Sequence, residues 1–478
     1  MGGVEALWLR RPFFMRAIWS HSLAFDDSDD DKTRSRRVPS SRSARLGTFG
    51  RLAGGLAGGI LAEGARRVAR GERPRMRDMM LTPGNAKRLA DRLSHLRGAA
   101  MKLGQMVSMD AGDFLPPELA DILATVRDQA YRMPPSQLRD VLDAEWGSDW
   151  RTRFARFNAT PIAAASIGQV HRAQTHDGRD LAIKVQYPGV RESIDADVDN
   201  VAGLLRLSNA LPKELDLAPL LEEAKRQLHD EADYEREAVR LERYRALLEG
   251  DERFVIPSIH ADLSTSRVLA MDFIEARPIE TLEDAAQEQR DQVMTDLIAL
   301  VASELFELGV MQTDPNFANY RWKPDTGQLV LLDFGATRDV APEIASAYRS
   351  LLAAGLAQDR AQVREAALAS GFVGPGVAQN HSAAMDRMID IIVTEMNRPG
   401  PFDFGDRAFV GTLRDEGMAM ASDKATWHIP PVDTLFVQRK ISGTALLAAR
   451  LKARVDVRKI VRPHVEGRRR GLANTAPD

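Results

Sequence analysis

Three side chains suited to magnesium-dependent phosphate chemistry are grouped in the segment Met311–Asp339. Asp314 is followed five residues later by Asn319, and Asp333 follows an apolar run and opens the triplet Asp-Phe-Gly. Metal ions that bridge phosphates prefer oxygen ligands, which Asn319 and Asp333 would supply. Asp314 would orient a nucleophile or accept its proton. The residue types and their spacing predict a centre for phosphoryl transfer.

A β-hairpin must bring these residues together. The segment Lys323–Gln328, with the letters KPDTGQ, has the composition of a hairpin turn, and Leu329–Leu332 reads as the strand that delivers Asp333. An Asp-Phe-Gly triplet alone is also compatible with an ordinary strand end followed by a turn. Together with the upstream Asp-x4-Asn spacing, it matches the magnesium-binding pattern of protein-kinase-like folds.

The second half of such a site is predicted between Phe154 and Tyr187. Kinases cover ATP with a loop of pattern G-x-G-x-x-G-x-V. Val170 falls on the Val of this pattern, and Lys184, the Lys of LAIKV, follows fourteen residues later. Two of the three loop glycines are replaced by alanine. We therefore predict a nucleotide-binding loop whose residues are Ala163, Ala164, Ala165, Ser166, Gly168 and Val170, followed by Lys184 on a third strand.

The alanine replacements have a physical consequence. Alanine adds a Cβ atom and resists positive φ, so the loop should be stiffer and approach a phosphate less closely than a glycine loop. This predicts slow or altered nucleotide chemistry. The alternative is that the alanine segment is only a tight hairpin packed on Leu181 and Ile183, away from nucleotide.

A kinase lysine needs a carboxylate to hold it, and one long amphipathic helix over Leu220–Leu248 is predicted to supply it. The acidic candidates on this helix are Glu231, Asp233 and Glu237. Spacing alone does not choose among them. Strands at Val255–Ile274 and a helix at Val293–Phe306 are predicted to follow and to lead into Asp314.

The segment after Asp-Phe-Gly is unusually short for a kinase. The tripeptide Ala341-Pro342-Glu343 begins only six residues after Gly335, which leaves no room for an activation segment. Pro342 is instead predicted to open a helix. The platform that holds a peptide substrate should therefore be missing, and helices are predicted onward to about Val457.

Composition bounds the remaining possibilities. The chain has 478 residues, 44% apolar and 28% charged, which is ordinary for a globular protein of one large or two ordinary domains. It has no Cys, which excludes disulfides, thiol catalysis and Cys-ligated metals. The net charge is only −3, yet residues 33–102 carry 17 Lys and Arg against four Asp and Glu. This imbalance predicts either contact with an anionic lipid surface or solvated arms.

The N-terminal region gives weaker signals. The first 40 or so residues are interpreted as a targeting segment or as the product of a misassigned start. The uncharged run Leu52–Ala62 has 11 residues, whereas a bilayer-spanning helix needs roughly 20. An interfacial segment and a Gly-rich linker are both compatible with it. A helix at Pro83–Asp110 places Lys102 and Gln105 on one face, where such residues are usually only solvated.

These motifs together resemble the UbiB/aarF-domain (ADCK) atypical kinase-like family. The resemblance runs from about Arg75 to Val457 and follows the family's motif order. The segment QTDPNFAN resembles the family branch of coenzyme Q biosynthesis. The motifs that carry it are KLGQ at Lys102, AAAS at Ala163, DEADYEREA with Glu231 and Asp233, MQTDPNFAN with Asp314 and Asn319, and LLDFGATRD with Asp333.

The resemblance implies an α+β, two-lobed protein-kinase-like fold with an N-terminal helical KxGQ extension and a mostly helical C-terminal lobe. It implies that Lys102 and Gln105 lie near Glu231 and Asp233, where a peptide would otherwise dock, and that Glu237 pairs with Lys184. The expected domains are a disordered or membrane-proximal basic region (1–74), the KxGQ extension (75–150), an N-lobe (151–280), a C-lobe (281–460) and a basic tail (461–478).

The expected function is that of an ATP-binding, magnesium-dependent atypical kinase-like ATPase that supports ubiquinone biosynthesis at a membrane. Its expected partners are ATP, an anionic or quinone-like lipid and other enzymes of ubiquinone biosynthesis, and no nucleic acid. We expect it in the cytoplasm at the inner membrane of a bacterium, or on the matrix side in mitochondria. The alternatives are a small-molecule phosphotransferase and a nucleotide-sensing scaffold with little turnover.

Overall fold

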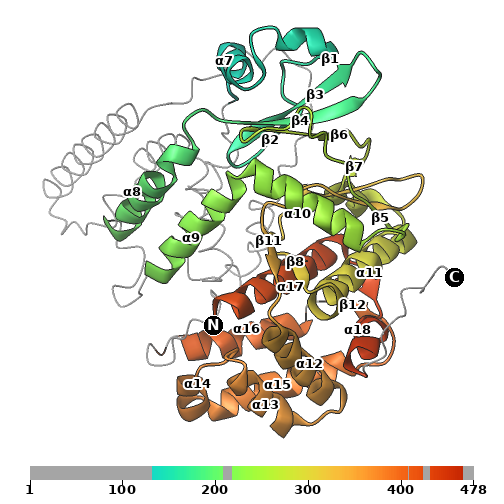
Figure 1. Cartoon of the computed structure of the whole chain (residues 1–478). Coiled ribbons are helices and arrows are strands. Elements are labelled where there is room, and N and C mark those ends of the chain that lie inside the picture. Colours follow the sequence, from blue (N-terminus) through green and yellow to red (C-terminus); the bar gives the residue numbers. More distant parts are fainter. Residues whose placement is uncertain (1–131, 208–217, 407, 422, 424–430, 467–478) are drawn as a thin grey trace, which may run out of the picture. The chain divides into compact units, whose positions relative to one another are not determined.

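Two units make up the chain, Met1–Val239 with Ser258–Phe273, and Arg240–Pro257 with Ile274–Asp478. The computed structural model describes residues 132–207, 218–406, 408–421, 423 and 431–466 (Figure 1). The basic N-terminal region, Lys102 and Gln105 lie outside the described residues, so the statements about them stay predictions.

The first unit is built on an antiparallel sheet that carries the alanine segment and Lys184. Its strand order is β1-β3-β4-β6, and the short strand β2 pairs with β3. The register sets Val170 opposite both Ala163 and Lys184. The strands are β1 (Phe154–Phe157), β2 (Ala163–Ala164), β3 (Gly168–Thr175), β4 (Asp180–Gln186) and β6 (Val268–Asp272).

One face of this sheet buries an aromatic core. Leu181, Ile183 and Val185 alternate along β4 and are completely buried, which is the period of two expected of a strand with one apolar face. They pack with residues of helix α7 (Pro135–Trp146), including Trp146. Figure 1 shows this helix near β1. The indole N–H of Trp146 donates to the carbonyl of Leu263 at 3.0 Å, which ties helix and sheet together.

The prediction of one helix over Leu220–Leu248 is wrong, because the chain breaks at Ala232 and Asp233. Helix α9 (Ala218–Glu231) ends there and helix α10 (Tyr234–Leu247) begins. The carboxylate of Asp233 accepts a hydrogen bond from the N–H of Arg236 at 3.0 Å and so caps α10. The buried amide of Gln186 donates to the carbonyl of Ala232 at 2.8 Å, which satisfies the broken helix end.

The second unit is mostly helical and contains the Asp-Phe-Gly segment. A four-stranded sheet, β5-β10-β9-β7, and a pair, β8-β11, support that segment. The predicted hairpin is confirmed, since β9 and β10 are antiparallel and Lys323 N–H donates to the Gln328 carbonyl across the turn at 2.9 Å. The strands are β5 (Phe254–Val255), β7 (Arg277–Pro278), β8 (Val310–Gln312), β9 (Tyr320–Trp322), β10 (Leu329–Leu331) and β11 (Thr337–Asp339).

Helices surround these strands in the second unit (Figure 1). Helix α12 begins at Pro342, as predicted from the proline. Among the described residues, no helix is both long and apolar enough to cross a bilayer. The helices are α11 (Gln287–Ser303), continued by a π-helical turn (Glu304–Leu308), α12 (Pro342–Leu356), α13 (Arg360–Ala369), α14 (Pro375–Asn380), α15 (Ser382–Met396), α16 (Ala408–Ala421), α17 (Val432–Leu451) and α18 (Val457–Val465).

The first unit has one further helix, and the second unit has one further pair of short strands. Helix α8 (Ile194–Leu207) follows the main sheet and contacts α9. A two-stranded pair, β12 (Phe402–Asp403) and β13 (Arg454–Val455), ties the loop after α15 to the end of α17.

A neutral histidine is buried inside the first unit. His171 on β3 has its Nδ1 atom 2.8 Å from the Asn158 carbonyl and its Nε2 atom 2.9 Å from the amide nitrogen of Gln169. Because a carbonyl only accepts, Nδ1 carries the proton and Nε2 accepts from Gln169. Burial lowers the pKa of His171 to about 4, against the opposing effect of the hydrogen bond to Asn158.

This histidine predicts acid sensitivity of the first unit. Below the unfolded pKa of about 6.5, the unfolded chain binds a proton that the folded chain refuses, so the free energy of unfolding falls as the pH drops toward 4. The expected slope from this group is at most about 1.4 kcal/mol per pH unit. Urea unfolding between pH 7 and pH 4.5 measures it.

The matched control is His176→Gln, because His176 is exposed in the turn after β3. The control should keep the wild-type slope between these pH values, whereas His171→Gln should flatten it. An unchanged slope in His171→Gln would show that other groups cause the acid sensitivity.

Candidate active site

A buried ion pair occupies the centre of the first unit. Both carboxylate oxygens of Glu237 accept from the Lys184 ammonium, at 2.8 and 2.9 Å. Lys184 is 8% exposed and Glu237 is 0% exposed. Two charges so far from water are tolerated only as partners. The structure thereby selects Glu237 among the three acidic candidates, in the arrangement that the family resemblance implied.

Tyr234 helps to build this environment. The Lys184 ammonium lies 5.0 Å from the centre of the Tyr234 ring, a favourable cation–π distance. The same tyrosine closes the space beside Gly168, where a Cβ atom would lie 2.5 Å from the Val185 carbonyl oxygen and 2.9 Å from the tyrosine oxygen. Glycine is therefore required at 168 by close packing. The sequence did not single out Tyr234, because a tyrosine after an acidic run has no distinctive spacing.

The alanine segment forms a tight hairpin. Ala165 N–H donates to the Gly168 carbonyl at 2.9 Å, and the side chain of Ile167 is buried at the tip. Among the described residues, positive φ values outside glycine occur only at Gln358 and Lys452. The alanines that replace kinase glycines thus adopt a backbone open to any residue, and they cause no backbone strain.

The register decides which face of the sheet the alanine segment shares. Residues directly opposite each other in antiparallel strands point to the same face, so Ala163, Val170 and Lys184 lie on one face. Leu181 and Ile183 alternate with Lys184 and point to the other face, into the aromatic core. Ala163 therefore lies on the side of the lysine, whereas Ala164, which is opposite Gln169 and through it Val185, lies on the side of Leu181 and Ile183.

The two other acidic candidates lie at the corner between α9 and α10. The Ser166 hydroxyl donates to a Glu231 carboxylate oxygen at 2.6 Å, which joins the tip of the alanine hairpin to the end of α9. Asp233 caps α10, a structural role that was not predicted from the sequence. Their predicted partners, Lys102 and Gln105, lie outside the described residues.

The second unit brings Asp314, Asn319 and Asp333 together. The Asn319 side-chain amide donates to the Asp314 carbonyl at 3.2 Å, and the Leu332 N–H donates to the Asn319 carbonyl at 3.1 Å. Leu332 immediately precedes Asp333, whose carboxylate accepts from the Gly335 N–H at 3.0 Å. Hydrogen bonds thus join Asn319 to Asp314 on one side and to the residue that precedes Asp333 on the other.

The Asp-Phe-Gly triplet is fixed from two sides by helix α10. The Phe334 ring is 1% exposed and lies 4.8 Å from the ring of Tyr244. The Arg240 guanidinium donates to the Gly335 carbonyl at 2.8 Å. The turn that presents Asp333 is therefore held by one aromatic contact and one charge-assisted hydrogen bond.

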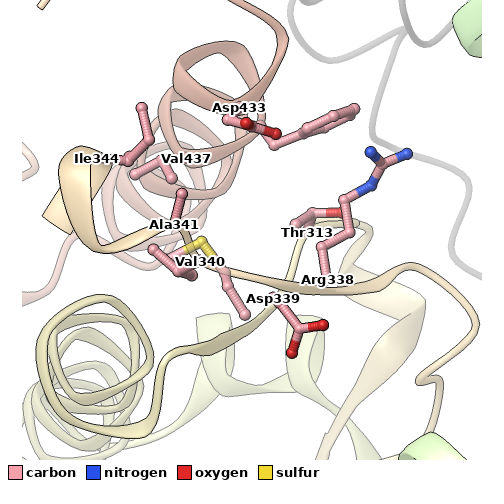
Figure 2. Close-up of a pocket in the computed structure, with 10 residues that line it drawn as sticks. Thr313, Arg338, Asp339, Val340, Ala341, Ile344, Asp433 and Val437 are labelled. Atoms are coloured by element: carbon pink, nitrogen blue, oxygen red, sulfur yellow. The ribbon is translucent and has the colours of Figure 1, made fainter.

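The chain after the triplet leaves little space for a peptide platform. β11 pairs with β8. Beside this pair, the N–H and the hydroxyl of Thr313 both donate to the Ala336 carbonyl, at 3.2 and 2.7 Å, so the two segments are joined directly. Figure 2 shows the small pocket that remains, with side chains from β8, β11, α12 and α17. The Arg338 guanidinium closes one side of it, 3.8 Å from the centre of the Phe436 ring.

Comparison with known proteins identifies the family of this chain. The model of the ABC1 atypical kinase-like domain matches residues 125–367 of the chain. The mitochondrial atypical kinase COQ8 of Saccharomyces cerevisiae is 35% identical over 441 residues, which cover 91% of this chain and 87% of that protein. The chain belongs to the ABC1 atypical kinase-like family. The mitochondrial atypical kinase COQ8B of Rattus norvegicus is 36% identical, over 90% of this chain and 81% of its own length.

A solved structure is also similar to this chain. The complex of Rv3197 with erythromycin from Mycobacterium tuberculosis superposes with a TM-score of 0.57 at 27% identity, over 77% of this chain and 92% of that one. The predicted fold class, an α+β kinase-like fold, is confirmed, as is the predicted family with its coenzyme Q branch.

Replacing Ala165 with glycine tests the alanine hairpin. Glycine removes the methyl group that restricts the approach of a phosphate, and it costs roughly 0.4–1 kcal/mol of stability through the unfolded chain. We expect the dissociation constants for ATP and ADP to change, or their ratio to change, by more than this stability loss explains. Calorimetric titration and the apo melting temperature measure both.

The matched control is Ala261→Gly, in an exposed turn of the same unit. It should lose similar stability and bind both nucleotides like the wild type. If Ala165→Gly also leaves both dissociation constants unchanged, the hairpin does not contact nucleotide.

Proposed function

We propose that this protein is a magnesium-dependent, kinase-like ATPase that supports ubiquinone biosynthesis at a membrane. The observation that carries the proposal is the hydrogen-bonded group of Asp314, Asn319 and Asp333 in the second unit. The paired Lys184 of the first unit supports it independently. Each unit thus contributes the residue types that phosphoryl transfer from ATP requires.

The residues present fit a magnesium ion. The Asn319 amide nitrogen is engaged by the Asp314 carbonyl, so the amide oxygen is the atom directed to a ligand. One carboxylate oxygen of Asp333 holds Gly335. Within the described residues, no cluster of three or more His, Asp or Glu side chains would hold a metal alone. Mg²⁺ bound beside phosphates needs only one or two protein oxygens, which Asn319 and Asp333 supply, and it would neutralise the phosphate charge.

Lys184 suits the α- and β-phosphates of ATP. Its ammonium is a positive charge held in place by two hydrogen bonds to the Glu237 carboxylate, which is the arrangement that kinase-like folds use for these phosphates. Asp314 would orient the attacking oxygen, and its carboxylate is itself oriented by the Asn316 N–H at 3.3 Å. Ala163, Ala164, Ala165, Ser166, Gly168 and Val170 form the hairpin that we propose lies over the nucleotide.

The short segment after Asp-Phe-Gly favours a water or a small acceptor over a peptide. β11 leads directly into α12, and the pocket of Figure 2 is lined largely by the apolar side chains of Met311, Ile344 and Val437. A phosphotransferase with a soluble acceptor and a nucleotide-sensing scaffold are the rival functions. Phosphate transfer to a soluble metabolite would favour the first, and binding without turnover would favour the second.

The membrane role rests on the relatives and on charge. Several relatives are named mitochondrial atypical kinases COQ8 or COQ8B, which motivates a role beside ubiquinone-biosynthesis enzymes. The basic N-terminal region would meet an anionic or quinone-like lipid, with the protein peripheral to the membrane. We propose that Lys102 and Gln105 act beside Glu231 and Asp233 to replace peptide binding.

Replacing Asp333 with Asn tests the proposed metal ligand. The change keeps the shape of the side chain and removes the anionic oxygen, so Mg²⁺-dependent binding of ATP should be lost. At an ATP concentration of about 100 Kd, the wild type should gain about 2.7 kcal/mol of stability, and the variant should gain far less. Thermal unfolding with and without Mg·ATP measures the difference.

The matched control is Asp325→Asn, in the exposed turn of the same hairpin. It should respond to Mg·ATP like the wild type. An undiminished response in Asp333→Asn would remove Asp333 from the site, and no response in the wild type would contradict nucleotide binding itself.

A further inference from the structure

A second buried ion pair lies in the interior of the second unit. Lys440 on α17 is 1% exposed and Glu304 is 0% exposed, and the ammonium nitrogen lies 3.6 Å from a carboxylate oxygen. Glu304 stands at the junction where α11 turns into a π-helix. Such π-helical turns are rare and concentrate at functional sites.

Glu304 reaches two segments of the candidate site through one oxygen. The Gln312 N–H donates to Oε1 at 2.8 Å, and the Tyr244 hydroxyl donates to the same atom at 2.7 Å. Gln312 ends the strand β8, two residues before Asp314. The Tyr244 ring packs on Phe334 of the Asp-Phe-Gly triplet. One buried carboxylate is therefore bonded on both sides of the predicted catalytic residues.

Lys440 contacts the two residues that flank the segment from Thr313 to Asn319. Its ammonium donates to the Tyr320 hydroxyl at 2.7 Å and to the side-chain oxygen of Gln312 at 3.2 Å. Tyr320 follows Asn319 directly in the chain. Helix α17 also touches the catalytic turn itself, since a Cβ atom on Gly443 would collide with the ring of Pro315.

Stability alone is a weak reason for this pair. Burial opposes the charge on Lys440, but the carboxylate of Glu304 and the hydroxyl of Tyr320 outweigh it and raise the pKa of the ammonium. A buried ion pair can often be replaced by apolar side chains without loss of stability. A charged pair whose hydrogen bonds all end on segments of one site is better explained by the placement of those segments.

We propose that Glu304 and Lys440 are positioning residues that set the geometry of Asp314, Asn319 and Asp333. Glu304 fixes the strand before Asp314 and the tyrosine behind Phe334. Lys440 fixes Tyr320, and through it the backbone beside Asn319. The inference rests on the proposed function, because it assigns the pair to the phosphoryl-transfer residues.

The test replaces Lys440 with methionine, which has similar length and no charge. If the pair positions the metal ligands, the Mg²⁺ concentration for half-maximal ATP binding should rise, and ADP release at saturating Mg²⁺ should fall by up to about 100-fold. Lys440→Arg keeps the charge and should retain more of both properties. Thermal shift across a Mg²⁺ series and an ADP assay on the full chain measure these effects.

The matched control is Thr444→Val, one turn further along α17. Thr444 is buried and its hydroxyl donates to the Lys440 carbonyl at 2.8 Å, so this variant disturbs the same helix but leaves the pair intact. It should keep the wild-type Mg²⁺ dependence at a comparable loss of melting temperature. Lys440→Met with the wild-type Mg²⁺ dependence and turnover would overturn the proposal.

A double variant covers the case in which Lys440→Met does not fold, and amide exchange covers the case in which the wild type does not respond to Mg·ATP. If Lys440→Met does not fold, the double variant Glu304→Gln/Lys440→Met removes both charges, and it should fold yet still show the raised Mg²⁺ requirement. If the wild type itself does not respond to Mg·ATP, the proposed function fails. Amide exchange at Gln312 in the apo protein then decides the inference, which stands if exchange is faster in Lys440→Met than in Thr444→Val and falls if it is not.

Discussion

A charge removed from water needs a partner, and this constraint shapes both units of the protein. In the first unit it joins Lys184 on β4 to Glu237 in the first turn of α10. In the second unit it joins Glu304 at the end of α11 to Lys440 on α17. Both pairs are nearly inaccessible, and each lies beside residues of the candidate phosphoryl-transfer chemistry.

The break between α9 and α10 shows how this constraint acts on the chain. If one helix ran through Ala232, Asp233 could not cap α10, and the Gln186 amide would lose the carbonyl that it now meets. The corner also brings Glu231 to Ser166 at the tip of the alanine hairpin. The break between α9 and α10 thus accompanies three contacts: Glu237 with Lys184, Glu231 with Ser166, and the cap that Asp233 forms on α10.

The sequence predicted those parts of the site that depend on local signals. Turn residues marked the hairpin at Lys323–Gln328, proline marked the start of α12, and motif spacing marked Asp314, Asn319 and Asp333. It did not predict the helix break, because Asp233 was considered as a partner of Lys184 and not as a helix cap, and Gln186 lies on a distant strand. The same reason hid Lys440, whose partners come from β8, β9 and the π-helical turn.

The chain between the Asp-Phe-Gly triplet and α12 is too short for an activation segment. Strand β11 pairs with β8 immediately after the Asp-Phe-Gly turn, and α12 follows at once. No further segment is inserted between Gly335 and Pro342, so we expect no platform for a peptide there. This arrangement is the reason for proposing turnover of ATP with water or a small acceptor.

The most direct measurement of this account is ADP release by the purified full chain in the absence of any protein or peptide acceptor. It should be made with and without anionic vesicles that contain a quinone-like lipid. If the proposed function is correct, ADP is released steadily and in a Mg²⁺-dependent way with an equal amount of inorganic phosphate, and the vesicles increase the rate. ADP release that appears only when a peptide is added and phosphorylated would contradict it.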